Sequence, residues 1–379
     1  ATVRCCTQNG VRGGSATVHF PIWHQEIEDI LVLKNNKGTE DNRVRKLDYS
    51  IQISKLFYER FIKNAEITLF SPNHVPDLYE AFGMPEFDSL YLKYEKDKSI
   101  PKQTIGAQEL FQALLKERAE TGRIYIMNLD HCNTHSSFKD KVYMSNLCQE
   151  ITLPTTPVQH IDDKEGEIAL CILSAINLGL LTDMNELEEL CDLSVRALDE
   201  IIDYQEYPVE AAKISAQSRR SLGIGYIGLA HYLAKNQVKY EDKKAWKLVD
   251  KITEAFQFYL LKASNNLAKE KTKCLWFEKT KYSDGILPID TYKKELDEIV
   301  KRDYTYDWEW LRKEIKEHGL RHSTLSAQMP SESSSVVSNA TNGVEPPRDY
   351  LSVKKSKKGP LKQIVPDYNR LKNYYTLLW

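Results

Sequence analysis

The sequence predicts an α/β fold built on a mostly parallel sheet or barrel. Segments with strand character alternate with helical segments along most of the 379 residues, and this order is typical of parallel strands joined by crossover helices. The composition is 41% hydrophobic and 28% charged, with a formal net charge of −2. These values are those of an ordinary globular protein with a sizeable core.

The elements expected in the first part of the chain follow from its hydrophobic periodicity. A glycine-rich loop at 9–14 precedes a β-leaning segment, which Pro21 ends. Strands are expected where short apolar runs stop at proline or a polar turn, and helices where apolar residues recur three and four positions apart. The expected strands are 15–20, 67–70 and 123–128, and the expected helices are 26–33, 48–61, 75–94 and 107–121.

The same criteria predict the elements of the remaining chain. Pro154 bounds an extended segment at 148–153, and glycines punctuate the stretch 221–225. A serine-rich run at 323–335 is expected to contain a helix start. The further expected elements are a β-leaning segment at 167–175 and helices at 185–203, 243–270, 290–300 and 308–318.

Several protein classes are excluded by simple properties of the sequence. No apolar run approaches the about 18 residues of a membrane span, we expect no leader peptide, and the near-neutral charge predicts no nucleic-acid partner. The seven cysteines lack regular spacing, which favours a reducing, cytoplasmic location over a secreted disulfide framework. Neither end resembles a natural domain edge, so we expect a fragment or one half of a split polypeptide.

A thiol flanked by an amide and a carboxylate is the most informative motif. Asn146, Cys148 and Glu150 occupy positions i−2, i and i+2, which project to one side of an extended segment. They are therefore expected to face one ligand together. The alternative is a buried cysteine in a strand, but the flanking amide and carboxylate would then each need a polar partner.

Other cysteines leave more than one interpretation open. Cys171 ends a short apolar run, and as a redox residue it needs a second thiol within disulfide reach. That thiol can be Cys148 or a cysteine outside this chain. Cys5 and Cys6 are adjacent, where a disulfide is strained, so one of them is expected to pack in the core. A thiol hydrolase using Cys148 would need a histidine base, and the sequence places none to serve it.

Two polar clusters have both a functional and a structural interpretation. Residues 131–135 (HCNTH) include metal-ligating types, yet no second Cys or His pair lies nearby, so no metal is expected. Residues 331–335 offer hydroxyls and backbone N–H groups at a helix start, an arrangement that binds anions. The alternative is a capped helix start with Glu332 in its first turn.

Taken together, these stretches resemble the large (alpha) subunit of class I ribonucleotide reductase, along essentially the whole chain. Gln328, at a position that is usually apolar in the family, is a small departure from the resemblance. The matching stretches are 10–14 (GVRGG), 31–36 (LVLKNN), 68–72 (TLFSP), 130–135 (DHCNTH), 145–148 (SNLC), 166–171 (GEIALC), 323–335 and 339–348 (NATNGVEPPR).

The resemblance implies a ten-stranded α/β barrel, with residues 1–379 forming an incomplete catalytic barrel domain. Cys148 would lie at the tip of a loop inside the barrel and become a thiyl radical that abstracts the 3′ hydrogen of the ribose. Glu150 would act as the general base on the 3′ hydroxyl, and Asn146 would hydrogen-bond the substrate there. Cys171 matches one of the two cysteines that reduce the substrate, and the resemblance places the other upstream of residue 1.

Binding residues are implied in the same way. The resemblance assigns the substrate diphosphate to Ser331, Glu332, Ser333 and Ser334. It assigns communication between effector nucleotide and substrate base to a specificity loop. The residues of that loop are Cys6, Gln8 and Arg12.

The implied activity is that of a thioredoxin-dependent ribonucleoside-diphosphate reductase, which supplies deoxynucleotides for DNA synthesis. The chain itself would hold no cofactor, because a separate di-iron small (beta) subunit supplies the radical. Thioredoxin or glutaredoxin would supply electrons, ATP and deoxynucleoside triphosphates would be effectors, and the alpha subunit would form a dimer. The alternative is a non-catalytic fragment or split half that binds nucleotides or partner subunits and needs a complementing chain.

Overall fold

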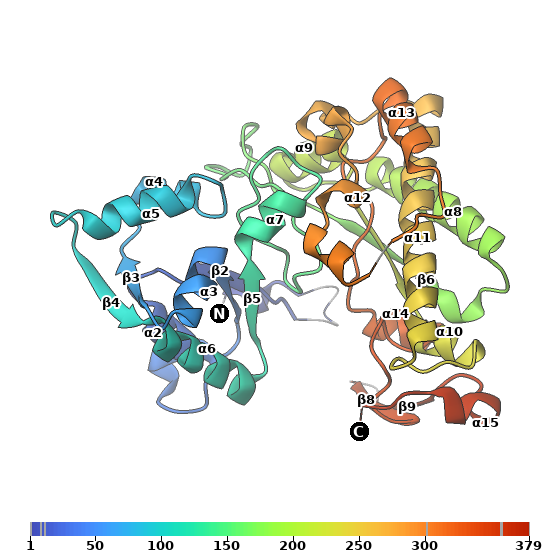
Figure 1. Cartoon of the computed structure of the whole chain (residues 1–379), viewed down its shortest axis with the longest axis horizontal. Helices are drawn as coiled ribbons and strands as arrows, with labels where there is room; N and C mark the ends of the chain where they lie inside the picture. The colour runs from blue at the N-terminus through green and yellow to red at the C-terminus, as the bar shows by residue number, and fades with distance from the viewer. Residues whose placement is uncertain (1, 8–9, 11–12, 301, 357–358, 379) are drawn as a thin grey trace. The chain divides into compact units, whose positions relative to one another are not determined.

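The computed structural model describes residues 2–7, 10, 13–300, 302–356 and 359–378. The chain forms two compact units (Figure 1). The first unit comprises residues 1–136 and 141–154, and the second comprises residues 137–140 and 155–379.

A parallel three-stranded sheet is the centre of the first unit. Its strands are β1 (Thr17–Pro21), β2 (Asp48–Ile53) and β5 (Ile124–Asn128), in the order β1-β2-β5. Strand β2 alternates between two environments: Tyr49, Ile51 and Ile53 enter the hydrophobic core, while the intervening polar side chains occupy the other face. The helices that contribute to this core include α2 (Ile27–Leu31), α3 (Lys55–Ile62), α4 (Pro76–Ala81), α5 (Phe87–Lys96) and α6 (Ala107–Thr121).

The second unit is organised around two parallel strands, β6 (Ile172–Asn177) and β7 (Leu222–Ile227), paired from Ile172↔Leu222 to Asn177↔Ile227. Apolar stripes of three helices pack on them and on one another to form the larger core. These helices are α8 (Met184–Tyr204), α11 (Lys243–Glu270) and α13 (Trp308–His318). Helix α11 begins and ends where its sequence period predicts, and α8 begins at an Asp183 side-chain cap.

The remaining elements are short. The antiparallel pairs are β3 (Glu66–Phe70) with β4 (Lys102–Gly106) and β8 (Leu351–Ser356) with β9 (Gly359–Ile364). The other helices are α1 (Thr2–Cys5), α7 (Leu129–His135), α9 (Glu210–Arg219), α10 (Leu229–Lys235), α12 (Pro288–Thr291), α14 (Glu332–Val337) and α15 (Tyr368–Leu371). The 3₁₀ turns are Val32–Lys34, Glu40–Asn42, Leu178–Leu180, Phe277–Lys279, Lys281–Asp284, Lys294–Glu298 and Lys372–Tyr374.

Most expected elements are confirmed, and three helices (α6, α11 and α13) have the predicted bounds. The expected helix 48–61 is wrong in its first half, because residues 48–53 alternate polar and apolar with the period of a strand, and α3 begins only after Ser54. The expected helix 75–94 is two helices, separated at Gly83, whose φ of 85° no helix tolerates. The helix expected at 290–300 is limited to short α12 and a 3₁₀ turn.

The predicted parallel pairing is confirmed in both units. Among the described residues the sheets have two or three strands each, and none of them closes on itself. This is what an incomplete barrel looks like. In the part of the chain that the structure describes, no helix has the length and apolarity needed to cross a membrane.

Candidate active site

Cys148 lies in a tight turn, which the sequence did not predict. Ser145 and Thr152 form an isolated antiparallel bridge at the base of the turn. The Gln149 N–H donates to the Asn146 carbonyl at 3.3 Å, and Gln149 has a φ of 67°. The extended segment expected at 148–153 is therefore wrong, because hydrogen bonds within the turn replace those of a strand.

Asn146 stabilises this turn with its side chain. Its Oδ1 accepts the Ile151 backbone N–H at 3.3 Å, and its backbone N–H donates to the Ile151 carbonyl at 3.4 Å. Asn146, Cys148 and Glu150 are thus brought together by one turn rather than by one strand face. The predicted grouping of an amide, a thiol and a carboxylate is retained with a different geometry.

The polar face of the β1-β2-β5 sheet holds the segment that contains Cys148. The Thr17 hydroxyl of β1 donates to the Leu147 carbonyl at 2.8 Å, next to Cys148. Gln52 Nε2 of β2 donates to the Tyr143 carbonyl at 2.5 Å. These residues occupy the strand positions that do not enter the core, so the sheet is apolar on one side and binds the turn on the other.

The surroundings of the turn include polar groups that the described residues do not satisfy. Cys148 is exposed, whereas Glu150 Oε2 and Gln149 Nε2 are buried without a hydrogen-bond partner. Burial raises the pKa of Tyr125, and the nearby Cys148 and Glu150 raise it further. Burial lowers the pKa of His19 to about 4, although the Ser145 backbone opposes this shift. An exposed thiol beside buried, unpaired polar atoms is the arrangement expected where a polar ligand binds.

Cys171 stands in a different environment, immediately before β6 and half-buried. The segment before it is fixed by Glu167, which is buried and bonded to the guanidinium of Arg219 through both carboxylate oxygens. Arg219 is 2% exposed, and its guanidinium lies over the rings of Trp276 and Phe138. A bidentate, buried pair of this kind gives a fixed geometry.

The residues expected to bind an anion lie at the start of α14. The predicted helix start is confirmed, with Glu332 as its first residue. The Ser331 hydroxyl donates to the Met329 carbonyl at 3.2 Å and makes no side-chain cap, so the first-turn N–H groups are not used by this hydroxyl. Asn342 Oδ1 accepts the Ser331 N–H at 3.2 Å, and Lys354 Nζ lies 3.0 Å from the Glu332 carbonyl.

The expected specificity loop is described only in part. Cys6 is exposed and follows α1, whereas Gln8 and Arg12 lie outside the described residues. Cys5 is exposed as well, so the prediction that one of these two cysteines packs in the core is wrong. A Cβ on Gly14 would lie 2.5 Å from the Cys6 carbonyl oxygen, so the two ends of the loop approach closely.

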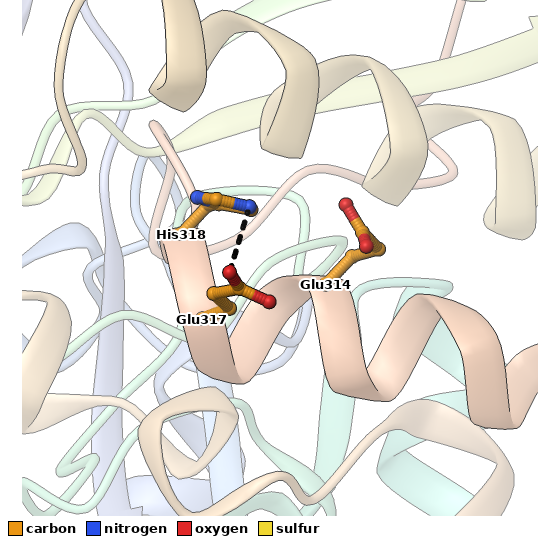
Figure 2. Close-up of side chains that lie close together, drawn as sticks. All are labelled: Glu314, Glu317 and His318. Carbon is orange, nitrogen blue, oxygen red and sulfur yellow. Dashed lines mark ion pairs between the residues drawn. The ribbon is translucent and has the colours of Figure 1, made fainter.

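Two clusters contain metal-ligating residue types. On α7 the rings of His131 and His135 lie 5.8 Å apart, and burial raises the pKa of the intervening Cys132 to about 11, which makes its thiol a poor ligand. On α13, Glu314, Glu317 and His318 point toward one another (Figure 2). In that cluster Lys269 pairs with Glu314, and His318 Nε2 lies 3.8 Å from Glu317 Oε1. Surface ion pairing accounts for the grouping of Glu314, Glu317 and His318 on α13.

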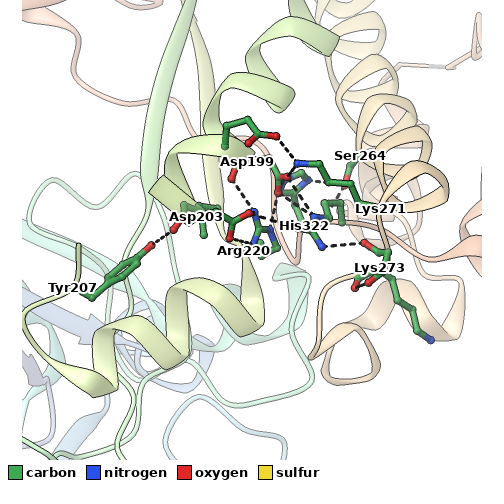
Figure 3. Close-up of polar contacts among 12 residues, drawn as sticks. Asp199, Asp203, Tyr207, Arg220, Ser264, Lys271, Lys273 and His322 are labelled. Carbon is green, nitrogen blue, oxygen red and sulfur yellow. Dashed lines mark hydrogen bonds and ion pairs between the residues drawn. The ribbon is translucent and has the colours of Figure 1, made fainter. Parts of the chain in front are cut away.

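A buried charge network organises the second unit around Asp199 of α8 (Figure 3). Asp199 is fully buried, and Arg220 Nε, His322 Nε2 and Lys271 Nζ lie 2.6, 3.1 and 3.0 Å from its carboxylate oxygens. Burial favours a higher pKa for Asp199, but the hydrogen bonds from His322 and Arg220 outweigh it and lower the pKa. The hydroxyl of Ser264 lies 2.9 Å from His322 Nδ1. Asp199, His322 and Ser264 are all buried, so this network is structural and is not a hydrolase triad.

Sequence reasoning missed the residues that hold the two cysteines. Thr17 and Gln52 support the Cys148 turn, and Arg219 with Glu167 supports the segment before Cys171. For Thr17 and Gln52 the available signal was the polar half of each alternating strand, which resembles an ordinary exposed face. Their partners lie far away in the sequence, so local pattern could not assign them.

Comparison with known proteins identifies the family to which the chain is similar. The family described as "Ribonucleotide reductase, barrel domain" matches residues 1–376. The chain is 60% identical over 382 residues to the ribonucleoside-diphosphate reductase subunit alpha of Haemophilus influenzae. It is 59% identical over 382 residues to the ribonucleoside-diphosphate reductase 1 subunit alpha of Escherichia coli K12, and 46% identical over 385 residues to the subunit alpha of enterobacteria phage T4.

Each of these comparisons covers 100% of this chain and 50% of the relative. The chain therefore spans about half the length of the curated relatives it matches. The predicted fold class is confirmed by the barrel-domain match and by the parallel strand pairs of both units. With a match over nearly all of its residues, the chain belongs to the ribonucleotide reductase barrel-domain family.

Proposed function

We propose that this chain forms part of the catalytic barrel of a ribonucleoside-diphosphate reductase, which converts ribonucleoside diphosphates to 2′-deoxyribonucleoside diphosphates. The observation that carries the proposal is the Cys148 turn. An exposed thiol lies two positions before Glu150, which has a buried carboxylate oxygen that no described residue hydrogen-bonds. Leaving such an oxygen unpaired is costly unless a ligand satisfies it.

The turn suits the first chemical step. As a thiyl radical, Cys148 would take the 3′ hydrogen atom of the ribose, and Glu150 would accept the proton of the 3′ hydroxyl. The Asn146 side-chain oxygen already accepts the Ile151 N–H. Its amide nitrogen is therefore the end that would donate a hydrogen bond to the substrate.

Reduction of the substrate would involve Cys171 and a second thiol. The two thiols lose two protons and two electrons and form a disulfide. The 2′ carbon–oxygen bond breaks, the oxygen leaves as water, and a carbon–hydrogen bond forms at the 2′ carbon. The rigid Glu167–Arg219 pair before Cys171 supports a role that needs a fixed sulfur position.

The start of α14 would bind the diphosphate. Glu332, Ser333 and Ser334 would offer first-turn N–H groups to the phosphate oxygens, and Ser331 would join them by exchanging its present bonds to Asn342 and Met329. The Glu332 carboxylate adds negative charge at this helix start, so a nearby cation is needed for an anionic ligand. Lys354, whose Nζ lies 3.0 Å from the Glu332 carbonyl, supplies that charge.

The proposal includes partners and a location. A separate di-iron small (beta) subunit would generate the radical, so no residue of this chain is assigned to a metal. Thioredoxin or glutaredoxin would restore the thiols, and the alpha subunit would act as a dimer in the cytoplasm. ATP and deoxynucleoside triphosphates would act as effectors through a specificity loop that includes Cys6, Gln8 and Arg12.

The test is complementation. This chain, mixed with the flanking segments of the subunit, the small subunit and a dithiol reductant, should form deoxynucleoside diphosphate. Cys148→Ser should abolish the product, while Cys5→Ser, which alters another exposed thiol, should retain it. Product that persists in Cys148→Ser would show the radical assignment to be wrong. Nucleotide binding without any product from the unsubstituted mixture would favour the non-catalytic alternative.

A further inference from the structure

The two faces of strand β7 differ sharply. Leu222, Ile224 and Tyr226 enter the hydrophobic core of the second unit. Gly223 and Gly225 occupy the alternate positions, which project to the opposite face. Neither glycine has a left-handed backbone, so conformational freedom does not explain its presence. The remaining explanation is the space that a missing side chain leaves.

At Gly223 that space contains the sulfur of Cys171. A Cβ built on Gly223 would lie 2.8 Å from Cys171 Sγ, 2.5 Å from Leu173 Cδ2 and 3.1 Å from Ala327 Cβ. Atoms pack best at roughly 3.5–4.0 Å, so a methyl group here would have to displace its neighbours. The sulfur therefore lies directly against the backbone of β7.

The three neighbours differ in how easily they can move. Leu173 is 43% exposed, and the atom concerned is the end of a flexible side chain. Ala327 is held in place because its N–H donates to the Ile224 carbonyl at 3.1 Å. Cys171 has one side-chain torsion, so its sulfur can avoid a new methyl group only by rotating to another rotamer.

We propose that Gly223 is a positioning residue for Cys171, because its missing side chain creates the site on β7 that the Cys171 sulfur occupies. This inference rests on the proposed redox role of Cys171 and adds a residue that determines where its sulfur lies. Disulfide formation requires a sulfur–sulfur distance of about 2.05 Å and a defined dihedral angle. A sulfur rotated away from β7 no longer meets the second thiol in that geometry.

The same strip of β7 contacts the segment that leads to the proposed diphosphate site. A Cβ on Gly225 would lie 2.4 Å from the Ala327 carbonyl oxygen and 3.1 Å from Met329 Sδ. Residues 325–329 therefore pack on β7 beside Cys171 and continue directly into Ser331. The three atoms nearest a Cβ on Gly225 all belong to this segment, whereas the Cys171 sulfur is among the three nearest a Cβ on Gly223.

The first experiment is a double-mutant cycle on this chain, read from urea unfolding midpoints. Gly223→Ala should lower the midpoint, and more than half of that loss should disappear when Cys171→Ala removes the sulfur. Gly106→Ala is the matched control, because its new methyl would meet only Glu109 atoms, at 3.7 and 3.8 Å. If Gly223→Ala lowers the unfolding midpoint equally with and without the Cys171 sulfur, the proposal is overturned.

The second experiment uses the complemented enzyme. Gly223→Ala should lower kcat at least tenfold and leave the KM for nucleoside diphosphate unchanged, because the sulfur and not the substrate site is displaced. The exchange variant Gly223→Ala/Ala327→Gly moves one methyl group across the contact. Recovery of kcat in this exchange variant would show that the glycine serves Ala327 instead, and would overturn the proposal.

If Gly223→Ala folds poorly, the same test can be made in a second variant. Adding Leu173→Ala removes the nearer contact at 2.5 Å and leaves the sulfur contact in place, so the cycle can be repeated in that background. The unfolding cycle needs no enzymatic activity. Its failure is therefore distinguishable from failure of the proposed function, which the Cys148→Ser assay tests.

Discussion

Two candidate cysteines, one in each unit, are held in opposite ways. Cys148 is exposed in a turn that polar side chains attach to a sheet, through hydrogen bonds to the Leu147 and Tyr143 carbonyls. Cys171 is half-buried against a glycine of β7, and a buried ion pair fixes the segment before it. The thiol proposed to reach the substrate is presented by hydrogen bonds, whereas the thiol proposed to meet another sulfur is placed by packing.

The largest expected effect is on the Cys171 side. Arg219→Ala would leave Glu167 charged and buried, and should cost about 3–5 kcal/mol in the free energy of unfolding. Urea unfolding of the isolated chain measures it. Lys273→Ala is the control, because Lys273 and Glu278 form an exposed pair worth at most about 1 kcal/mol. Similar losses for both substitutions would contradict the view that packing and a buried pair place Cys171.

The stability of the folded protein is expected to depend on pH through one histidine in each region. Burial lowers the pKa of His322 to about 4, against the opposing effect of Asp199, and lowers that of His19 to about 4. The unfolded chain, with an ordinary histidine pKa near about 6.5, then binds protons more readily than the folded protein. Stability should therefore be complete above about pH 6.5 and fall as the pH drops toward about 4.

The two histidines can be separated by substitution. Since the pKa of each ring falls to about 4, each histidine should contribute about 2–3 kcal/mol to the pH-dependent loss of stability. The dependence of the unfolding midpoint on pH between pH 7 and pH 4 should flatten in His322→Asn and, by a similar amount, in His19→Phe. An unchanged slope in His322→Asn would show that this ring is not neutral in the folded protein.

A smaller effect is expected at the Cys148 turn. Thr17→Val removes the hydroxyl that donates to the Leu147 carbonyl. It should lower the free energy needed to open the turn locally by about 1 kcal/mol. The loss should be local, so hydrogen exchange at the Ile151 N–H should speed up while the global unfolding midpoint changes little. Thr17→Ser keeps the hydroxyl and should retain the protection. Loss of protection in Thr17→Ser as well would assign the effect to packing.

The smallest effect is expected at Gln328, beside the Cys171 region. Its Nε2 donates to the Tyr226 carbonyl at 2.7 Å, and its Oε1 lies 3.4 Å from the Tyr226 N–H, so the amide continues the pairing of β7. Gln328→Leu should lower the free energy of unfolding by at most about 1 kcal/mol, because only one of the two hydrogen bonds is short. Urea unfolding measures it, with Gln328→Glu as the comparison that keeps the shape and loses the donor.

Local pattern predicted the long helices well. Helices α6, α11 and α13 are each long enough for apolar residues to recur over several turns, so their period identified them. Residues 48–53 alternate with the period of a strand, but they run directly into α3 without a proline or glycine between them, so the helical period of α3 predicts too long a helix. The Cys148 turn was missed because the bonds of Asn146 to Ile151 are irregular and have no period.

The sequence by itself determined which residues are candidates for the chemistry. Asn146, Cys148 and Glu150 are close in the chain, and their types and spacing do not depend on the fold. Only the tertiary structure decided how each thiol is held. Arg219 meets Glu167, and Gly223 meets the Cys171 sulfur, across separations that no local pattern spans. The reason is physical. The regular periods of helices and strands relate residues that are near neighbours in the sequence. Burial instead brings together distant residues that fit one another in shape and charge.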